Sequence, residues 1–211
     1  AETGVVQDAG SILASLDPHG IPWMMDATAL MAHSTIPEGW TLAIADAPAW
    51  GGPAGVGVLA IRTGTRWRSP DYPADAYEFA RVPGMPAVPA IAAAAAALTT
   101  LRADAETRAE RLADLSTRLR TQVAARIEHV QIHSGDGGCP HITSMSFLYV
   151  SGEDLASRLD KEGFAVGSGS ACANELHTPS HVLAAMGRLT EGNLRITLPL
   201  DASAEEVDSF V

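Results

Sequence analysis

Residues 104–127 constrain the fold of this chain more than any other segment. Five apolar side chains recur there at steps of three and four residues: Leu112, Leu115, Leu119, Val123 and Ile127. Steps of this size align side chains along one stripe of an α-helix, while the intervening Arg and Glu residues form a solvated face. The segment therefore predicts one long amphipathic helix.

Short apolar segments alternate with helical ones along the rest of the chain. We expect strands at residues 21–25, 42–45, 56–62, 130–133, 142–150, 164–166 and 194–198, of which 142–150 has alternating polar and apolar character. We expect further helices at residues 7–16, 90–101 and 153–162, from Pro179, and from about Ala204. A turn at residues 63–65 is expected to return the chain as a hairpin at residues 66–68. Strands that alternate with helices predict an α/β protein.

Composition limits the partners and the compartment. The formal net charge of −11 argues against nucleic acid as a direct partner, since phosphate binding needs clustered Lys and Arg. The most apolar run, residues 87–98, is too short to span a bilayer. Two cysteines, Cys139 and Cys172, provide no disulfide framework, which is typical of the reducing cytosol. We therefore expect a cytoplasmic protein that binds neither nucleic acid nor membrane.

Cys172 follows a run of the smallest residues, Gly-Ser-Gly-Ser-Ala, between a predicted strand and a predicted helix. Glycine admits backbone angles that other residues avoid, so the run is typical of a loop that presents a thiol to solvent. A buried small residue in a tight turn is the alternative interpretation. The local sequence does not decide between the two.

Motifs spread in order over nearly the whole chain resemble those of the cysteine desulfurases. The C-terminal motifs are Gly-Ser-Ala-Cys at 169–172, Pro-Ser-x-Val-Leu-x-Ala-Met-Gly at 179–187 and Leu-Arg-Ile-Thr at 194–197. The upstream motifs are Glu-Thr-Gly-Val-Val-Gln at 2–7, Met-Asp-Ala at 25–27 and Gly-Pro-x-Gly-Val-Gly at 52–57. Cysteine desulfurases are pyridoxal phosphate (PLP) enzymes of the class-V aminotransferase group. They convert L-cysteine to L-alanine and leave a persulfide on an enzyme cysteine.

The resemblance implies PLP-transferase fold type I. Residues 1–102 would complete the large, mostly parallel-sheet cofactor lobe, and residues 103–211 would form a small α+β lobe that carries Cys172. The first residues match the interior of the family's Asn-Glu-x-Gly-x-x-Gln motif, so the chain resembles the latter part of a longer protein and lacks its N-terminal part. A homodimer is expected, because the active site of the family draws residues from both subunits.

The resemblance also implies roles for individual residues. Cys172 corresponds to the cysteine that carries the persulfide, and Arg195 to the arginine that binds the substrate carboxylate. Asp26 corresponds to the aspartate that pairs with the pyridinium nitrogen of PLP, and Gln7 is a weaker candidate for cofactor binding. A surface ion pair for Arg195 and a polar strand end for Asp26 are the alternatives. The implied partners are sulfur acceptors, either iron–sulfur scaffold proteins or small sulfur carriers.

A metal site near the cysteines is the less favoured interpretation. Cys172 lies close in sequence to His177 and His181, and Cys139 lies close to His141. Pro179 interrupts the helix that would be needed to bring His177 and His181 to one face. Because the family that the chain resembles has no metal there, we expect solvent-exposed histidines and no metal.

The chain departs from the family pattern where the cofactor would bind. The family's Ser-x-His-Lys motif reads Asp-Ala-Pro-Ala at residues 46–49, so the position of the Schiff-base lysine is Ala49. The only lysine in the chain is Lys161. A carboxylate at Asp46 would repel the cofactor phosphate instead of donating a hydrogen bond to it. Further departures are Ala29 for a glutamine, Ala54 for the lysine of Gly-Pro-Lys-Gly, and residues 81–85 for Arg-Ser-Gly-Thr.

These departures favour a degenerate cysteine desulfurase-like protein in sulfur transfer, with Cys172 as the persulfide-accepting thiol. PLP would then be bound without a covalent link or not at all. Two alternatives stay open. One is an active PLP-dependent cysteine desulfurase, and the other is a non-catalytic dimerisation or scaffold module.

Overall fold

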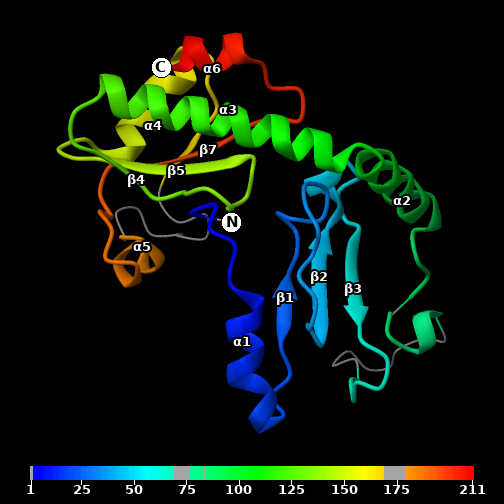
Figure 1. Ribbon diagram of the computed structural model, residues 1–211. Helices are drawn as coiled ribbons and strands as arrows, with labels where there is room; N and C mark the ends of the chain where they lie inside the picture. Colours follow the sequence, from blue (N-terminus) through cyan, green and yellow to red (C-terminus); the bar gives the residue numbers. More distant parts are fainter. Residues whose placement is uncertain (1, 69–76, 83, 169–178) are drawn as a thin grey trace. The chain divides into compact units, whose positions relative to one another are not determined.

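The computed structural model describes residues 2–68, 77–82, 84–168 and 179–211 (Figure 1). The chain forms two compact units. The N-terminal unit is Asp8–Ala105, and the C-terminal unit combines Ala1–Gln7 with Glu106–Val211. The first seven residues join the C-terminal unit because Cys139 N donates a hydrogen bond of 2.6 Å to Gly4 O. Gly4 has φ 72°, and a side chain there would collide with the Ile142 carbonyl, so this close approach requires glycine.

A three-stranded sheet forms the frame of the N-terminal unit. Its strands, in spatial order, are β1 (Met24–Asp26), β2 (Leu42–Asp46) and β3 (Gly57–Ile61). β1 and β2 are parallel, with Asp26 opposite Ile44, and β3 is antiparallel to β2. All three were predicted, but β1 begins three residues later than expected. Pro22 has no N–H to donate to a ladder, and the Trp23 carbonyl instead accepts from Thr41 N and Leu42 N.

In the N-terminal unit, a side-chain cap stabilises one helix, and a buried indole joins two others. They are α1 (Ala9–Leu16), η1 (Asp17–His19), η2 (Ala47–Trp50), η3 (Tyr77–Phe79) and α2 (Val88–Arg102). Asp8 caps α1, since its Oδ1 accepts from Gly10 N at 3.0 Å. Trp50 is 2% exposed and donates from Nε1 to Ala94 O at 3.0 Å, which joins η2 to α2. The predicted hairpin strand at residues 66–68 is wrong, because these residues form no strand.

The C-terminal unit contains an antiparallel sheet in the order β4-β5-β7-β6. Its strands are β4 (Val130–Ile132), β5 (Ile142–Phe147), β6 (Gly167–Ser168) and β7 (Asn193–Thr197). Its helices are α3 (Ala105–Arg126), α4 (Gly152–Lys161), α5 (His181–Ala185) and α6 (Ala204–Phe210). None of the helices in the described part of the chain has the length and apolar character needed to cross a bilayer.

The predicted stripe of α3 is confirmed for four of its five members. Leu112, Leu115, Leu119 and Val123 are buried against Met145, Leu194 and Ile196 of the sheet. In Figure 1, α3 crosses the face of β4, β5 and β7 that these residues share. Ile127 is the exception, because the helix ends at Arg126 and leaves this side chain 39% exposed. Hydrogen bonds join α3 to the C-terminal segment, where Arg118 pairs with Asp208 at 2.6 Å and Arg111 donates to the carbonyls of Leu200 and Ala202.

The alternation of polar and apolar residues predicted for β5 is confirmed, but all six of its residues are buried, so both sides of the strand are covered. Met145 and Phe147 lie in the apolar core under α3. Ser144 and Ser146 project from the opposite side of the strand and are completely buried as well. We call this second side of the sheet the polar face. It is formed by polar residues on neighbouring strands: Ser144, Ser146, Asn193 and Arg195, with His133 just after β4.

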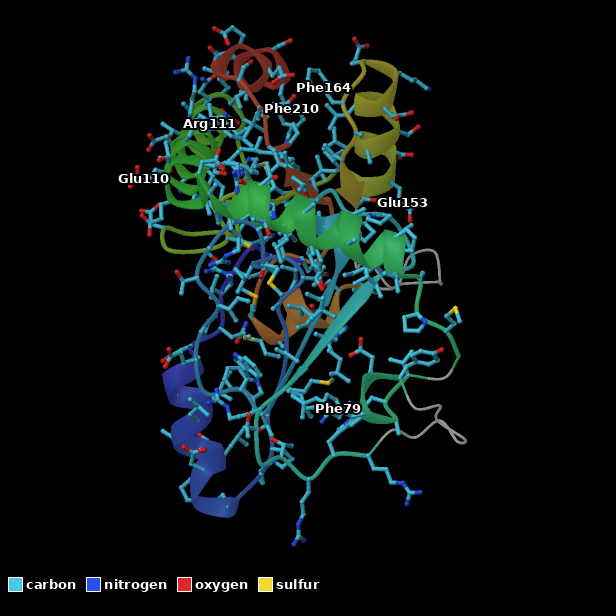
Figure 2. The ribbon with its side chains drawn as sticks, turned by 90° about the vertical axis from the view of Figure 1, so that its right-hand side faces the viewer. Phe79, Glu110, Arg111, Glu153, Phe164 and Phe210 are labelled. Atoms are coloured by element: carbon cyan, nitrogen blue, oxygen red, sulfur yellow. The ribbon has the colours of Figure 1, made fainter. Side chains whose placement is uncertain are left out.

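The strand expected at residues 164–166 is also wrong, and the paired residues are Gly167 and Ser168 of β6. Phe164 instead contacts Phe210 of α6 edge to face, with ring centroids 5.3 Å apart (Figure 2). The next predicted element, α5, begins two residues later than expected. Its N-cap is Ser180, whose Oγ accepts from Leu183 N at 3.1 Å.

Candidate functional site

Two exposed carboxylates lie at the edge where parallel strands β1 and β2 end. Asp26 is the last residue of β1 and Asp46 the last residue of β2. Asp26 pairs with Ile44, so Asp46 lies two residues farther along and on the same side of the sheet. The Asp26 carboxylate accepts a hydrogen bond of 2.9 Å from Thr28 N. We call this region, with the η2 helix that follows β2, the cofactor edge.

Ala49 is an exposed residue of η2. Its neighbours Ala47 and Trp50 are buried and hold the short helix against the core of the N-terminal unit. The backbone at position 49 is therefore fixed by packing, and only a methyl group projects from it. Lys161, the single lysine of the chain, lies exposed on α4 of the C-terminal unit.

PLP, the cofactor implied by the resemblance, does not fit the residues of the cofactor edge. Its aldehyde needs an amine, which Ala49 does not have. Its phosphate needs donors, whereas Asp46 is an acceptor with a negative charge. Asp26 alone matches a feature of PLP, the pyridinium nitrogen. Gln7, the weaker candidate, is exposed.

Arg195 lies on β7 between Ser144 of β5 and Gly167 of β6. It is half-buried, and its guanidinium lies over Gly167. An ideal Cβ on Gly167 would be 2.9 Å from Nη2 of Arg195 and 3.3 Å from Cζ. Within the described ranges the guanidinium forms neither an ion pair nor a hydrogen bond. Arg195 thus offers a planar set of donors suited to a carboxylate.

The polar face around Arg195 is connected by buried hydrogen bonds. Asn193 Nδ2 donates to Ser144 Oγ at 3.2 Å and to Met145 O at 3.3 Å. Ser146 Oγ donates to Leu189 O at 2.8 Å, and Leu189 N donates to Gln131 at 2.6 Å. These bonds attach the segment before β7 to the polar face. No sequence motif marked these residues, although the serines at alternate positions of β5 could have indicated a second buried side.

His133 belongs to the same network and is 5% exposed. Its Nε2 lies 2.8 Å from Ser146 Oγ. Because the Ser146 hydroxyl donates its proton to Leu189 O, Nε2 of His133 must be the donor in this bond. Burial lowers the pKa of His133, and the positive charge of Arg188 lowers it further. His133 is therefore neutral at pH 7.

Of the two cysteines, the structure describes only Cys139. Cys172 lies outside the described residues, and so does His177. Cys139 is a thiol that is 8% exposed, and burial raises its pKa. A raised pKa leaves less thiolate, so Cys139 is a poor nucleophile. Among the residues that the structure describes, no three His, Cys, Asp or Glu side chains gather as metal ligands.

Comparison with known proteins decides the family. The model of the aminotransferase class-V family matches residues 1–210 of this chain. The chain belongs to the class-V aminotransferase family. Its recognition from the motifs is therefore confirmed, and PLP is the cofactor expected of the family.

Curated proteins similar to this chain include cysteine desulfurases. The chain is 30% identical to cysteine desulfurase IscS of Dictyoglomus turgidum, covering 98% of this chain and 48% of that protein. It is 32% identical to cysteine desulfurase IscS of Photorhabdus laumondii, covering 98% of this chain and 52% of that protein. The chain thus spans about half the length of the curated relatives it matches.

Solved structures confirm the class-V fold. A NifS-like protein from Rickettsia africae matches with a TM-score of 0.87 and 19% identity, over 99% of this chain and 57% of that one. The apo cysteine desulfurase from Thermococcus onnurineus matches with a TM-score of 0.77 and 20% identity, over 98% of this chain and 55% of that one. The predicted α/β fold of PLP fold type I is therefore correct.

Proposed function

We propose that this chain acts in sulfur transfer as a cysteine desulfurase-like protein without Schiff-base chemistry of its own. One observation carries the proposal. Position 49, which corresponds to the Schiff-base lysine, is an exposed alanine on a rigidly packed helix, η2. The carboxylate of Asp46 at the same edge adds a charge that repels phosphate.

Cys172 is the persulfide-accepting thiol in this proposal. Its thiolate attacks the outer sulfur of a persulfide on a PLP-dependent desulfurase. A new S–S bond forms at Cys172, the S–S bond of the donor breaks, and the donor leaves as a thiolate. The outer sulfur keeps its proton throughout. A second exchange of the same kind passes the sulfur to an iron–sulfur scaffold protein or a small sulfur carrier.

Two features of the C-terminal unit support this assignment. Cys139, the other cysteine, is buried and its pKa is raised, which leaves Cys172 as the candidate nucleophile. The Arg195 guanidinium has no partner within the described part of the chain and suits the carboxylate of an amino-acid ligand. We further propose that the protein works as a homodimer in a reducing, cytosolic compartment.

Persulfide loading tests the proposal directly. The protein is incubated with a PLP-dependent cysteine desulfurase and L-cysteine, and the additional sulfur on each cysteine is measured by alkylation and peptide mass spectrometry. We expect loading on Cys172 and its loss in Cys172→Ser. Cys139→Ser is the matched control, which should load as the wild type does. Unchanged loading of Cys172→Ser would contradict the proposal.

An active PLP-dependent cysteine desulfurase is the second candidate function. The similarity to cysteine desulfurases along 98% of the chain favours it. It would require an amine from outside the cofactor edge. The two functions differ in one product, because only the active enzyme releases L-alanine from L-cysteine by itself.

A further inference from the structure

Gly167 lies in strand β6, and the backbone conformation at this position does not require glycine. Its φ lies outside the left-handed region, so any L-residue could adopt this conformation. Gly167 is the first of the two residues of β6, at the edge of the sheet, and glycine in a strand loses more backbone entropy on folding and contributes no side chain to packing. A reason for glycine at this position must therefore lie in the space beside it.

That space is filled by Arg195. A Cβ on Gly167 would be 2.9 Å from Nη2, 3.3 Å from Cζ and 3.6 Å from Nε of the guanidinium. The first distance is shorter than van der Waals contact, so one of the two groups would have to move. Nη2 lies at the end of a flexible side chain, and it is the group that can move.

On the side of β5, few interactions fix the position of the Arg195 side chain. Its partner across β5 is Ser144, whose Oγ already accepts from Asn193 Nδ2. Neither an ion pair nor a hydrogen bond fixes the guanidinium among residues 2–68, 77–82, 84–168 and 179–211. Its place over β6 therefore depends on packing against Gly167, and its N–H donors stay available for an anion.

We propose that Gly167 is a positioning residue for Arg195. The missing side chain lets the guanidinium lie flat across β6, and this placement sets the plane in which two parallel N–H groups meet a carboxylate. The inference rests on the proposed function, in which Arg195 binds the carboxylate of an amino-acid ligand. It adds that residue 167 controls how well that carboxylate is bound.

Stability and binding should move in opposite directions when a methyl group is added at this position. Gly167→Ala relieves the entropic cost of a strand glycine, so the thermal midpoint should stay the same or rise. The same methyl group displaces the guanidinium, so carboxylate binding should fall. A purely structural glycine would give the reverse pattern, a lower midpoint with unchanged binding.

The test measures binding of L-alanine to the full chain by NMR titration, with L-alanine methyl ester as the probe that lacks a carboxylate. We expect Gly167→Ala to weaken L-alanine binding about tenfold, as expected for losing one charge-assisted hydrogen bond. The Nε–Hε resonance of Arg195 is assigned by its absence in Arg195→Lys. This resonance should shift in Gly167→Ala. Gly57→Ala is the matched control, because Gly57 is also a strand glycine with an ordinary φ and its Cβ would lie 3.6 Å from Ala45 O.

A double-mutant cycle separates positioning from a general effect. In an Arg195→Lys background, which keeps the charge but lacks the planar fork, Gly167→Ala should change binding less than about threefold. An equal loss in both backgrounds, or wild-type binding by Gly167→Ala, would overturn the inference. Absence of L-alanine binding by the wild type would overturn it as well, while persulfide loading of Cys172 would remain an independent measure of the proposed function.

Discussion

At the scale of single residues, the polar face shows how burial changes the chemistry of a side chain. His133 donates through Nε2 to Ser146, and its Nδ1 is buried without a hydrogen-bond partner in the described structure. A proton on Nδ1 would have no acceptor, which agrees with the lowered pKa of His133. A neutral His133 therefore satisfies the hydrogen bonds of the network, whereas a charged His133 would bury an N–H donor that has no acceptor.

The pH dependence of stability tests this interpretation. A histidine whose pKa is lower in the folded state than its ordinary value of 6.5 binds fewer protons when folded. Its contribution to stability is therefore complete above about pH 6.5 and is lost as the pH falls below it, because only the unfolded chain gains the proton. We expect this loss in the wild type, measured by urea unfolding between pH 7.5 and about pH 5.

His133→Gln is the informative variant in this experiment. The glutamine Nε2 can donate to Ser146 as the histidine does, but it does not titrate. The variant should lose less stability than the wild type over the same pH range. Identical profiles for His133→Gln and the wild type would contradict a neutral His133.

At the scale of elements, α3 shows that a sequence stripe and a buried stripe can differ in length. Leu119 and Ile127 both fall on the predicted stripe, but Leu119 is 1% exposed and Ile127 is 39% exposed. The difference arises because the helix ends at Arg126, and the chain then turns through His129, with φ 58°, into β4. Packing on the sheet, rather than periodicity, decides which side chains contribute to the core.

Alanine substitution distinguishes these two positions. Leu119→Ala should lower the free energy of unfolding by about 2–5 kcal/mol, since it removes buried methyl groups and leaves a cavity under α3. Ile127→Ala should cost less than about 1 kcal/mol, because much of its side chain already contacts water. Urea unfolding of the two variants provides the comparison. Equal losses would mean that Ile127 is buried like Leu119.

At the scale of the whole molecule, the departures from the family pattern fall in the N-terminal unit, where Asp26 is the retained cofactor residue. Asp46, Pro48 and Ala49 belong to the N-terminal unit, whereas Arg195 belongs to the C-terminal unit. The chain spans about half the length of its curated relatives. Whether this chain binds PLP is therefore measured on the chain itself.

Absorption spectroscopy provides this measurement. With PLP added to the purified chain, we expect no Schiff-base band beyond the one that PLP forms with the exposed amine of Lys161, because Ala49 offers no amine. Addition of L-cysteine should release no L-alanine beyond the amount formed by free PLP alone. A protein-bound Schiff-base band together with catalytic release of L-alanine would refute the proposed loss of PLP chemistry. It would establish the active cysteine desulfurase instead.

The amino-acid sequence by itself determined the local elements and the family. The stripe of α3, the strands β1 to β3 and the exchange of lysine for Ala49 can be read from periodicity and motifs, because each depends on residues close together in the chain. Only the tertiary structure decided the surroundings of Arg195. The strand order β4-β5-β7-β6 brings Ser144 of β5 and Gly167 of β6 to the two sides of Arg195 on β7, from distant parts of the chain. Contacts of this kind depend on strand pairing across long loops, and no local pattern encodes them.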